Sequence, residues 1–180
     1  MEYLKLLTEL RKVKSNKSII IAIDGLAGSG KTTLAQKLVN DLSDAQVIHM
    51  DDLYDGWDDP LSAKLATRVI SQLFQPFMIQ LPVKYQSFNW KLNRFDVIKS
   101  VHQSKYLIVE GVGSGQISFS EYIDKLVWIQ IDPQVGFERV IARDGEQVRN
   151  EMLKFLVDQN NHFLAELTKI RADYTLEGAP

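Results

Sequence analysis

The sequence contains no cysteine, and this absence excludes disulfide bonds, zinc sites built on thiolates and cysteine nucleophiles. It also lacks an excess of either charge: the net charge is -2 and the isoelectric point is near 5.9, so nothing attracts the whole chain to nucleic acid or an anionic membrane. No apolar run is long enough to cross a bilayer. We therefore expect no nucleic-acid or membrane partner and a cytoplasmic location by default; whether the chain forms a homo-oligomer is left open.

What the chain does have is the composition of a globular domain. Its 180 residues are 45% hydrophobic and 24% charged, which allows a substantial core. Charges interrupt the N-terminal segment and exclude a signal peptide, while apolar residues recur there at helical spacing, namely Tyr3, Leu4, Leu7, Leu10 and Val13. Because nothing resembles a linker or a repeat, we predict a single domain over residues 1–180.

The order of apolar patterns predicts the fold class. Short runs rich in β-branched residues predict buried parallel strands at 18–23, 106–109 and 126–131, with a weaker strand at 46–49. Helical patterns lie between and after them, at 32–42, 62–74, 133–143 and about 146–171. Strands that alternate with helices indicate an α/β fold with a mostly parallel sheet flanked by helices. Residues 81–96 break this pattern, so we predict an irregular or hairpin insertion at about 76–96.

The stretch "GLAGSGKTT" concentrates glycine between a predicted strand and a predicted helix. Glycine is costly in ordered backbone, so something at this point must need bare backbone. Gly25-x-x-x-x-Gly30-Lys31-Thr32 fits the phosphate-binding loop pattern, known as Walker A. Successive N–H groups can surround a phosphate, the helix N-terminus adds its positive dipole end, and we expect an exposed Lys31 to reach the β- and γ-phosphates.

Thr32 would offer its hydroxyl to Mg²⁺. The nucleotide-binding residues predicted from this motif are Gly25, Ala27, Gly28, Ser29, Gly30, Lys31, Thr32 and Thr33. The alternative is a glycine-rich turn followed by a helix cap.

A second glycine cluster, "EGVGSGQ", begins at Glu110. It does not fit the dinucleotide-binding pattern, because GxGxxG from Gly111 would need glycine where Gln116 stands. The cluster instead predicts a loop at the carboxyl edge of the sheet, where ligands of open α/β folds bind. Glu110 follows the strand directly and could face Mg²⁺ through water; a solvated loop glutamate is the alternative.

With these motifs in view, most of the chain resembles the uridine kinase-like branch of P-loop kinases. "GLAGSGKTTLAQKL" matches the first motif of that family, and "VIHMDDLYDGW" resembles the segment after its second strand, where an aspartate and a tyrosine map onto Asp51 and Tyr54. "LIVEGVGSG" resembles the third motif. "VWIQIDPQVGFERVIARD" resembles the strand and helix that lead to the arginine-bearing lid, which places Arg139 and Arg143. The resemblance implies a P-loop NTPase three-layer fold and an ATP- and Mg²⁺-dependent phosphotransferase.

Physical chemistry supports a role for the acidic segment. Asp51, at the carboxyl end of a strand, could accept the proton of an acceptor hydroxyl or help to hold Mg²⁺. Its neighbour Asp52 could do the same, and the sequence does not separate the two. A solvated loop is the alternative for the acidic run as a whole, Asp51, Asp52, Asp55, Asp58 and Asp59.

Two arginines and four aromatic residues complete the candidate site. Arg139 and Arg143 lie four residues apart, so both can reach one phosphate, in a lid predicted at about 143–150; the alternative is surface pairing with Glu138 or Asp144. Aromatic walls of an acceptor pocket are predicted at Tyr54, Trp57, Phe88 and Trp90, with ordinary packing as the alternative. The family tends to show Tyr-Asp-aromatic where this chain has "FNW", which puts uridine itself in doubt as the acceptor.

These observations predict a kinase that acts on the hydroxyl group of a small molecule. Lys31, Asp51, Arg139 and Arg143 are the predicted catalytic residues, and the predicted metal ligands are Thr32, Asp51 and Glu110. A nucleotide kinase with a phosphate acceptor is a close alternative, although the sequence around Tyr54 shows only acids. A nucleotide-dependent switch without phosphotransfer is the other, but the GTPase motif Asn-Lys-x-Asp is absent.

Overall fold

A computed structural model describes residues 2–13 and 18–178, so residues 1, 14–17 and 179–180 of the predicted domain lie outside the described part. Within the described residues, five parallel strands form one sheet in the order β2-β5-β1-β6-β7. The fold class is therefore as predicted. The strands of this sheet are β1 (Ile19–Gly25), β2 (Ala45–His49), β5 (Tyr106–Glu110), β6 (Lys125–Gln130) and β7 (Tyr174–Glu177).

The register of the sheet brings the carboxyl ends of neighbouring strands together. Ile23 of β1 pairs with Glu110 of β5, and His49 of β2 pairs with the same Glu110 from the other side. Because parallel strands end at one edge, the loops that follow β1, β2 and β5 all leave the sheet side by side. The predicted site residues therefore lie at this edge.

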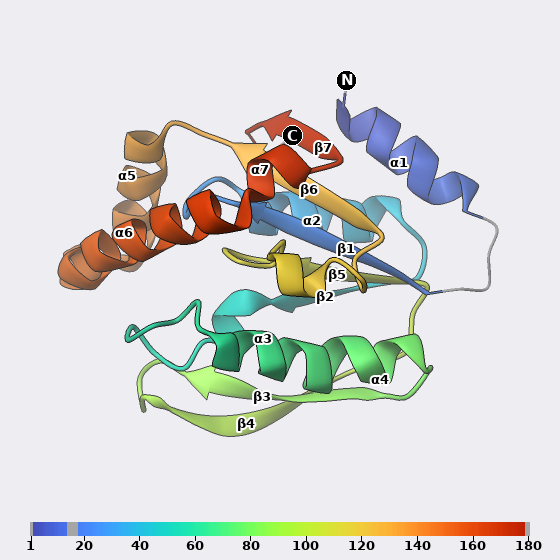
Figure 1. Cartoon of the computed structure of the whole chain (residues 1–180), viewed down its shortest axis with the longest axis horizontal. Coiled ribbons are helices and arrows are strands. Elements are labelled where there is room, and N and C mark those ends of the chain that lie inside the picture. The colour runs from blue at the N-terminus through green and yellow to red at the C-terminus, as the bar shows by residue number, and fades with distance from the viewer. Residues whose placement is uncertain (1, 14–17, 179–180) are drawn as a thin grey trace.

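Helices cover both faces of the sheet (Figure 1). One face packs against α1 (Glu2–Lys12) and α2 (Lys31–Asp41), where Leu6, Leu34 and Leu38 are fully buried. The other face packs against α3 (Ala63–Val69), a π-helical segment Ile70–Phe74 and α4 (Gln75–Met78). The helix predicted at 62–74 thus continues to Met78 through the π-helical segment. No helix among the described residues combines the length and apolar content needed to cross a membrane.

The insertion is a hairpin. Strands β3 (Val83–Asn89) and β4 (Arg94–Val101) pair antiparallel, which confirms the hairpin alternative but extends it beyond the predicted end at residue 96. The inward side chains of β3 join the core beneath α3 and α4. The hairpin lies below that helical layer in Figure 1, and its tip approaches the loop after β2.

The C-terminal part of the chain differs from the prediction of one long helix over 146–171. After α5 (Pro133–Asp144), the chain forms a 3₁₀ turn Glu146–Val148, then α6 (Arg149–Glu166) and the short α7 (Thr168–Arg171). Leu167 has φ 50°, a left-handed conformation that ends α6. The chain then returns to the sheet as β7, a strand that the sequence analysis did not predict.

Candidate active site

The phosphate-binding loop connects β1 to α2 in the predicted context. Gly30 directly precedes α2 and has φ 96°. Position 28 requires glycine for a second reason besides access for a ligand. A Cβ there would lie 2.1 Å from the carbonyl oxygen of Gly136 on α5. The backbone of α5 therefore presses directly on the loop. The amide of Ala27 is turned to the protein and donates to Gln159 Oε1 at 2.7 Å.

Lys31 is buried, so the prediction of an exposed lysine is wrong. Its side chain folds back under the loop, and Nζ donates to the carbonyl oxygens of Gly25 at 2.9 Å and Leu26 at 2.8 Å. Burial lowers the pKa of Lys31, while the carboxylates of Asp24 and Glu110 act in the opposite direction. The loop thus holds an ammonium group in its interior, with anionic groups around it.

Glu110 lies at the centre of a cluster formed by three segments. It is buried at the end of β5, and its Oε1 accepts a hydrogen bond from Thr32 Oγ1 at 2.9 Å. His49 Nδ1 lies 2.5 Å from the same oxygen, and this bond to Glu110 raises the pKa of His49. No spacing in the sequence singles out His49, but the strand register, which pairs it with Glu110, places it in the site.

Asp51 and Asp52 follow β2 in a 3₁₀ turn, Met50–Asp52, and they have different surroundings. Asp51 is exposed to solvent, but the protein around its carboxyl group and the charge of Glu110 raise its pKa; Lys31 and Arg143 act in the opposite direction. Asp51 therefore shares the electrostatic environment of the phosphate-binding loop.

The carboxylate of Asp52 is held by the hairpin. It accepts hydrogen bonds from Tyr85 Oη at 3.1 Å and Ser87 Oγ at 3.0 Å, and it pairs with Lys99 Nζ at 2.7 and 2.8 Å. All three partners come from β3 and β4. Asp52 thus anchors the hairpin to the loop after β2, which separates the two aspartates that the sequence left unresolved.

The two arginines of α5 are placed differently. Arg139 Nη1 approaches the carbonyl oxygen of Gly28 at 3.5 Å, so this side chain already lies against the phosphate-binding loop. Arg143 forms a bidentate pair with Asp144, with both bonds at 2.7 Å, which is the surface pairing considered as an alternative. The carboxylates of Asp51 and Glu110 also act on the charge of Arg143.

The four aromatic residues predicted as pocket walls gather in one cluster, which we call the aromatic cluster. Trp90 is its centre, with ring centroids 5.1 Å from Trp57, 5.3 Å from Phe88 and 6.5 Å from Tyr54. Phe155 of α6 joins the cluster at 6.3 Å from Tyr54 and 6.2 Å from Trp57. The sequence analysis missed Phe155, because its position looks like any buried position of an amphipathic helix.

Only the two tryptophans of the aromatic cluster present ring surface to solvent. Trp57 is 38% exposed and Trp90 is 40% exposed, whereas Tyr54 and Phe88 are buried. Tyr54 is fixed by donating its hydroxyl to the carbonyl oxygen of Val112 at 2.7 Å. Trp90 Nε1 donates to the backbone oxygen of Asp51 at 3.0 Å, so one of the two accessible rings is fixed to the backbone of the predicted catalytic residue.

Asp24, the penultimate residue of β1, was also missed. Its fully buried carboxylate accepts backbone hydrogen bonds from Gly25 at 2.7 Å, Gly113 at 3.1 Å and Gly115 at 2.8 Å. Burial raises its pKa to about 6, although these N–H groups and Lys31 favour the charged form. The sequence feature that could have identified Asp24 is an acidic residue directly after a continuous apolar run.

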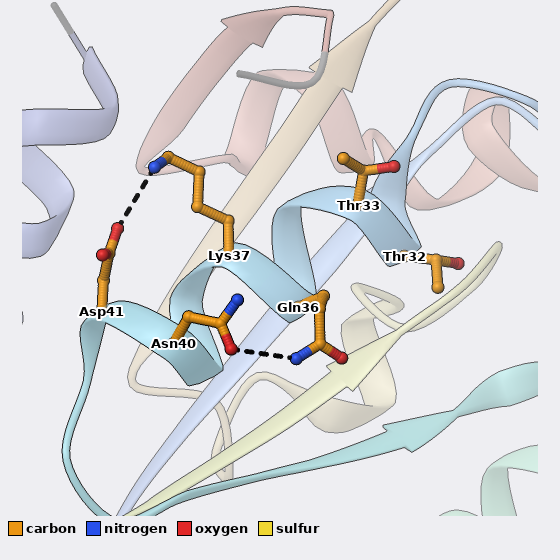
Figure 2. A pocket seen from close by; sticks show the side chains of 6 residues that line it. All are labelled: Thr32, Thr33, Gln36, Lys37, Asn40 and Asp41. Atoms are coloured by element: carbon orange, nitrogen blue, oxygen red, sulfur yellow. Dashed lines mark hydrogen bonds and ion pairs between the residues drawn. The ribbon is translucent and has the colours of Figure 1, made fainter.

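An open groove runs from the phosphate-binding loop along the exposed face of α2 (Figure 2). Its volume is about 660 Å³, and Thr32 and Thr33 lie at the end nearest the loop. Farther along, Gln36 bonds Asn40 at 3.2 Å and Lys37 pairs with Asp41 at 3.4 Å. The side of α2 that begins at the predicted metal ligand Thr32 is therefore open and polar.

The predicted metal ligands suit Mg²⁺ in chemical type. Thr32 and Glu110 place two oxygens 2.9 Å apart, and Asp51 adds a carboxylate to the same electrostatic cluster. The described residues contain no group of three or more His, Cys, Asp or Glu side chains arranged to hold a metal by themselves. Mg²⁺ usually takes one or two carboxylates and completes its shell with water and substrate phosphates, so an all-protein cage is not required.

Comparisons with known proteins give a consistent result. A protein-family profile described as "AAA domain" matches residues 21–162. "Putative kinase protein 029R" of Invertebrate iridescent virus 3 is 23% identical over 187 residues, which cover 88% of this chain and 87% of the viral protein.

Two solved structures show the same fold. One is described as a "Possible Uridine Kinase" from Bacillus stearothermophilus, with a TM-score of 0.72, 18% identity and coverage of 98% of this chain and 97% of that chain. The other is a "putative fructose transport system kinase" from Silicibacter sp. TM1040, with a TM-score of 0.67, 18% identity and coverage of 98% and 99%. The fold is therefore that of P-loop kinases.

Proposed function

The chain belongs to the AAA domain family, and on that premise we propose that it is an ATP- and Mg²⁺-dependent kinase that phosphorylates a hydroxyl group of a small molecule. The observation that carries the proposal is the convergence of Lys31, Thr32, Glu110 and Asp51 at one edge of the sheet. Phosphoryl transfer needs positioning and charge neutralisation more than covalent chemistry from the protein. This edge offers an ammonium group, a hydroxyl and two carboxylates for those tasks.

Each residue then has a defined task. Lys31 and the amides of the phosphate-binding loop other than that of Ala27 bind the phosphates. Thr32 and Glu110 would hold Mg²⁺, which would neutralise phosphate charge. Asp51 accepts the proton of the acceptor hydroxyl or contributes to the metal site. Arg139, already against the loop at Gly28, stabilises charge on the transferred group.

The aromatic cluster supports a ring-shaped acceptor, such as a nucleoside or another planar metabolite. Trp90 contacts the backbone of Asp51, Trp57 packs against Trp90, and both are partly exposed; aromatic faces bind planar ligands by stacking. Two basic residues that contact the acidic segment are occupied, because Lys99 pairs with Asp52 at 2.7 Å and Arg68 with Asp55 at 3.5 Å. This pairing favours a hydroxyl acceptor over the phosphate acceptor of a nucleotide kinase.

We also propose that residues 143–150 form a lid. The segment joins α5 to α6 through Gly145, which has φ 92°, and it begins with the charged side chain of Arg143. Closure would bring Arg143 over the phosphates and exclude water from the transfer. The exposed ion pairs in this segment, Arg143 with Asp144 and Arg149 with Glu146, are individually weak and could be exchanged for phosphate contacts.

The experiment that tests the function is an acceptor screen. The wild-type protein and a Lys31→Ala control are incubated with Mg·ATP and a panel of nucleosides, vitamins and sugars, and ADP release is measured for each. Release that depends on one class of acceptor and disappears in the control supports the proposal. A slow hydrolysis that is equal with every acceptor would instead indicate a nucleotide-dependent switch, and failure of the wild type to bind an ATP analogue would contradict both.

A further inference from the structure

A buried glutamine of α6 reaches the phosphate-binding loop from the C-terminal part of the chain. Gln159 is 2% exposed, and its Oε1 accepts the backbone N–H of Ala27 at 2.7 Å, across 132 positions of sequence. The other buried side chains of α6, Met152 and Phe155, are apolar. Burying a polar side chain costs free energy unless the side chain is hydrogen-bonded. The hydrogen bond to Ala27 therefore accounts for a glutamine at this buried position.

The loop is also contacted at Ala27 by α5. A Cβ on Gly136 would lie 2.6 Å from the carbonyl oxygen of Ala27, so the two backbones are in direct contact. Ala27 is therefore fixed through both of its peptide groups, by Gly136 at the carbonyl and by Gln159 at the amide. An N–H group held in this way cannot turn without leaving both itself and Gln159 unsatisfied.

The same helix also contacts the acceptor side of the site. Phe155 lies one helical turn before Gln159, on the same face, and packs against Tyr54 and Trp57 of the aromatic cluster. One rigid element thus touches the loop predicted to hold the phosphate donor and the rings predicted to hold the acceptor.

We propose that Gln159 is a positioning residue that holds the phosphate-binding loop in its nucleotide-binding conformation and fixes its distance from the aromatic cluster. The inference rests on the proposed nucleotide binding. Without the hydrogen bond, the loop would populate other conformations, and a nucleotide would have to select the competent one.

The test compares variants by their affinity for Mg·AMP-PNP, measured by calorimetry. Gln159→Met keeps the shape of the side chain but removes the acceptor oxygen, and we expect affinity to fall about 10-fold, the effect of one unsatisfied buried donor. Asn160→Met is the control: it also replaces an amide by methionine, at the neighbouring, exposed position of α6, and its affinity should equal that of the wild type.

A second variant separates hydrogen bonding from packing. Gln159→Glu keeps an acceptor oxygen and the size of the side chain, because a carboxylate accepts an N–H hydrogen bond as an amide oxygen does. We expect the Ala27 N–H to stay protected from hydrogen exchange in Gln159→Glu, whereas Gln159→Met should lose this protection. A folded Gln159→Met protein that keeps wild-type affinity, or that keeps the protection of Ala27, would overturn the proposal.

Amide hydrogen exchange in the unmodified protein provides a test that needs no variant. The Ala27 N–H should be protected in the absence of nucleotide, because its partner is buried. Free exchange at Ala27 would contradict the inference even if every substitution failed to fold. Failure of the wild type to bind Mg·AMP-PNP would count against the proposed function instead. The exchange result at Ala27 would still show whether the hydrogen bond to Gln159 exists.

Discussion

Replacing Asp51 by Asn keeps the size of the side chain and removes its charge and its capacity to accept a proton. A general base typically contributes about 10²–10⁴-fold to a rate, so phosphotransfer by Asp51→Asn should fall by that factor, or about 3–5 kcal/mol in the barrier. Nucleotide binding should change little, because the loop amides and Lys31 remain in place. The assay is acceptor-dependent ADP release, measured together with affinity for an ATP analogue.

The position of Asp51 allows a second role, and Mg²⁺ dependence distinguishes the two. If Asp51 mainly holds the metal, its loss should weaken nucleotide affinity, and raising Mg²⁺ should restore part of the activity. If it is the base, added Mg²⁺ should restore nothing. The raised pKa of Asp51 adds a pH signature: activity needs the ionised carboxylate, so it is lost as pH falls, at a higher pH than for an ordinary aspartate near pH 4. Asp51→Asn should lack this acid limb.

Asp52→Asn is the matched control for this prediction. Its carboxylate holds the hairpin through Tyr85, Ser87 and Lys99, so the neutral variant should lose about 1–2 kcal/mol of stability and a few degrees in Tm, with turnover within a few-fold of the wild type. Full activity in Asp51→Asn together with a large catalytic loss in Asp52→Asn would refute the assignment and exchange the two roles.

Three further predictions test other parts of the site. Lys31→Ala should lower ATP turnover about 10²–10³-fold while the protein stays folded, and near-normal turnover in a folded variant would contradict the loop assignment. Residues 143–150 should gain hydrogen-exchange protection when an ATP analogue binds, and unchanged exchange with binding confirmed would count against a lid. The folded protein keeps the proton of Asp24 up to about pH 6, so the free energy of unfolding should fall by up to about 3 kcal/mol as pH rises from about 4 to 6. Chemical denaturation of Asp24→Asn should show a weaker dependence of this free energy on pH than the wild type. An equal pH dependence in the two proteins would contradict the raised pKa.

The parts of the fold that follow from local pattern were predictable from the sequence. Continuous apolar runs identified β1, β5 and β6, because a strand buried on both faces must be apolar throughout. Strand β7 was missed because four residues carry too little periodicity to separate a strand from a loop. The end of α6 at Leu167 was missed because a leucine in a left-handed conformation has no signature in composition.

In the candidate site, too, the features that depend on local sequence were predictable and those that depend on distant contacts were not. Residues of the phosphate-binding loop, and Glu110 at a strand end, follow from short motifs whose chemistry is local. The separation of Asp51 from Asp52 depends on partners in the hairpin, and the role of Gln159 depends on a contact across 132 positions, so neither could be deduced from neighbours in the chain. The inward orientation of Lys31 was missed for a related reason, since the carbonyl groups that bind it belong to the folded loop.

The two glycine clusters have similar compositions but differ in what their backbone N–H groups bind. The first fits the phosphate-binding motif, whereas the second, after Glu110, turns two N–H groups inward: Gly113 and Gly115 donate to Asp24 at 3.1 and 2.8 Å. The same carboxylate accepts the N–H of Gly25, where the first loop begins. One buried acid therefore joins the loop that is predicted to bind phosphate to the loop that follows the predicted metal ligand. Because Asp24 holds both loops at once, a change in its charge should displace Glu110 and the phosphate-binding loop together rather than either alone.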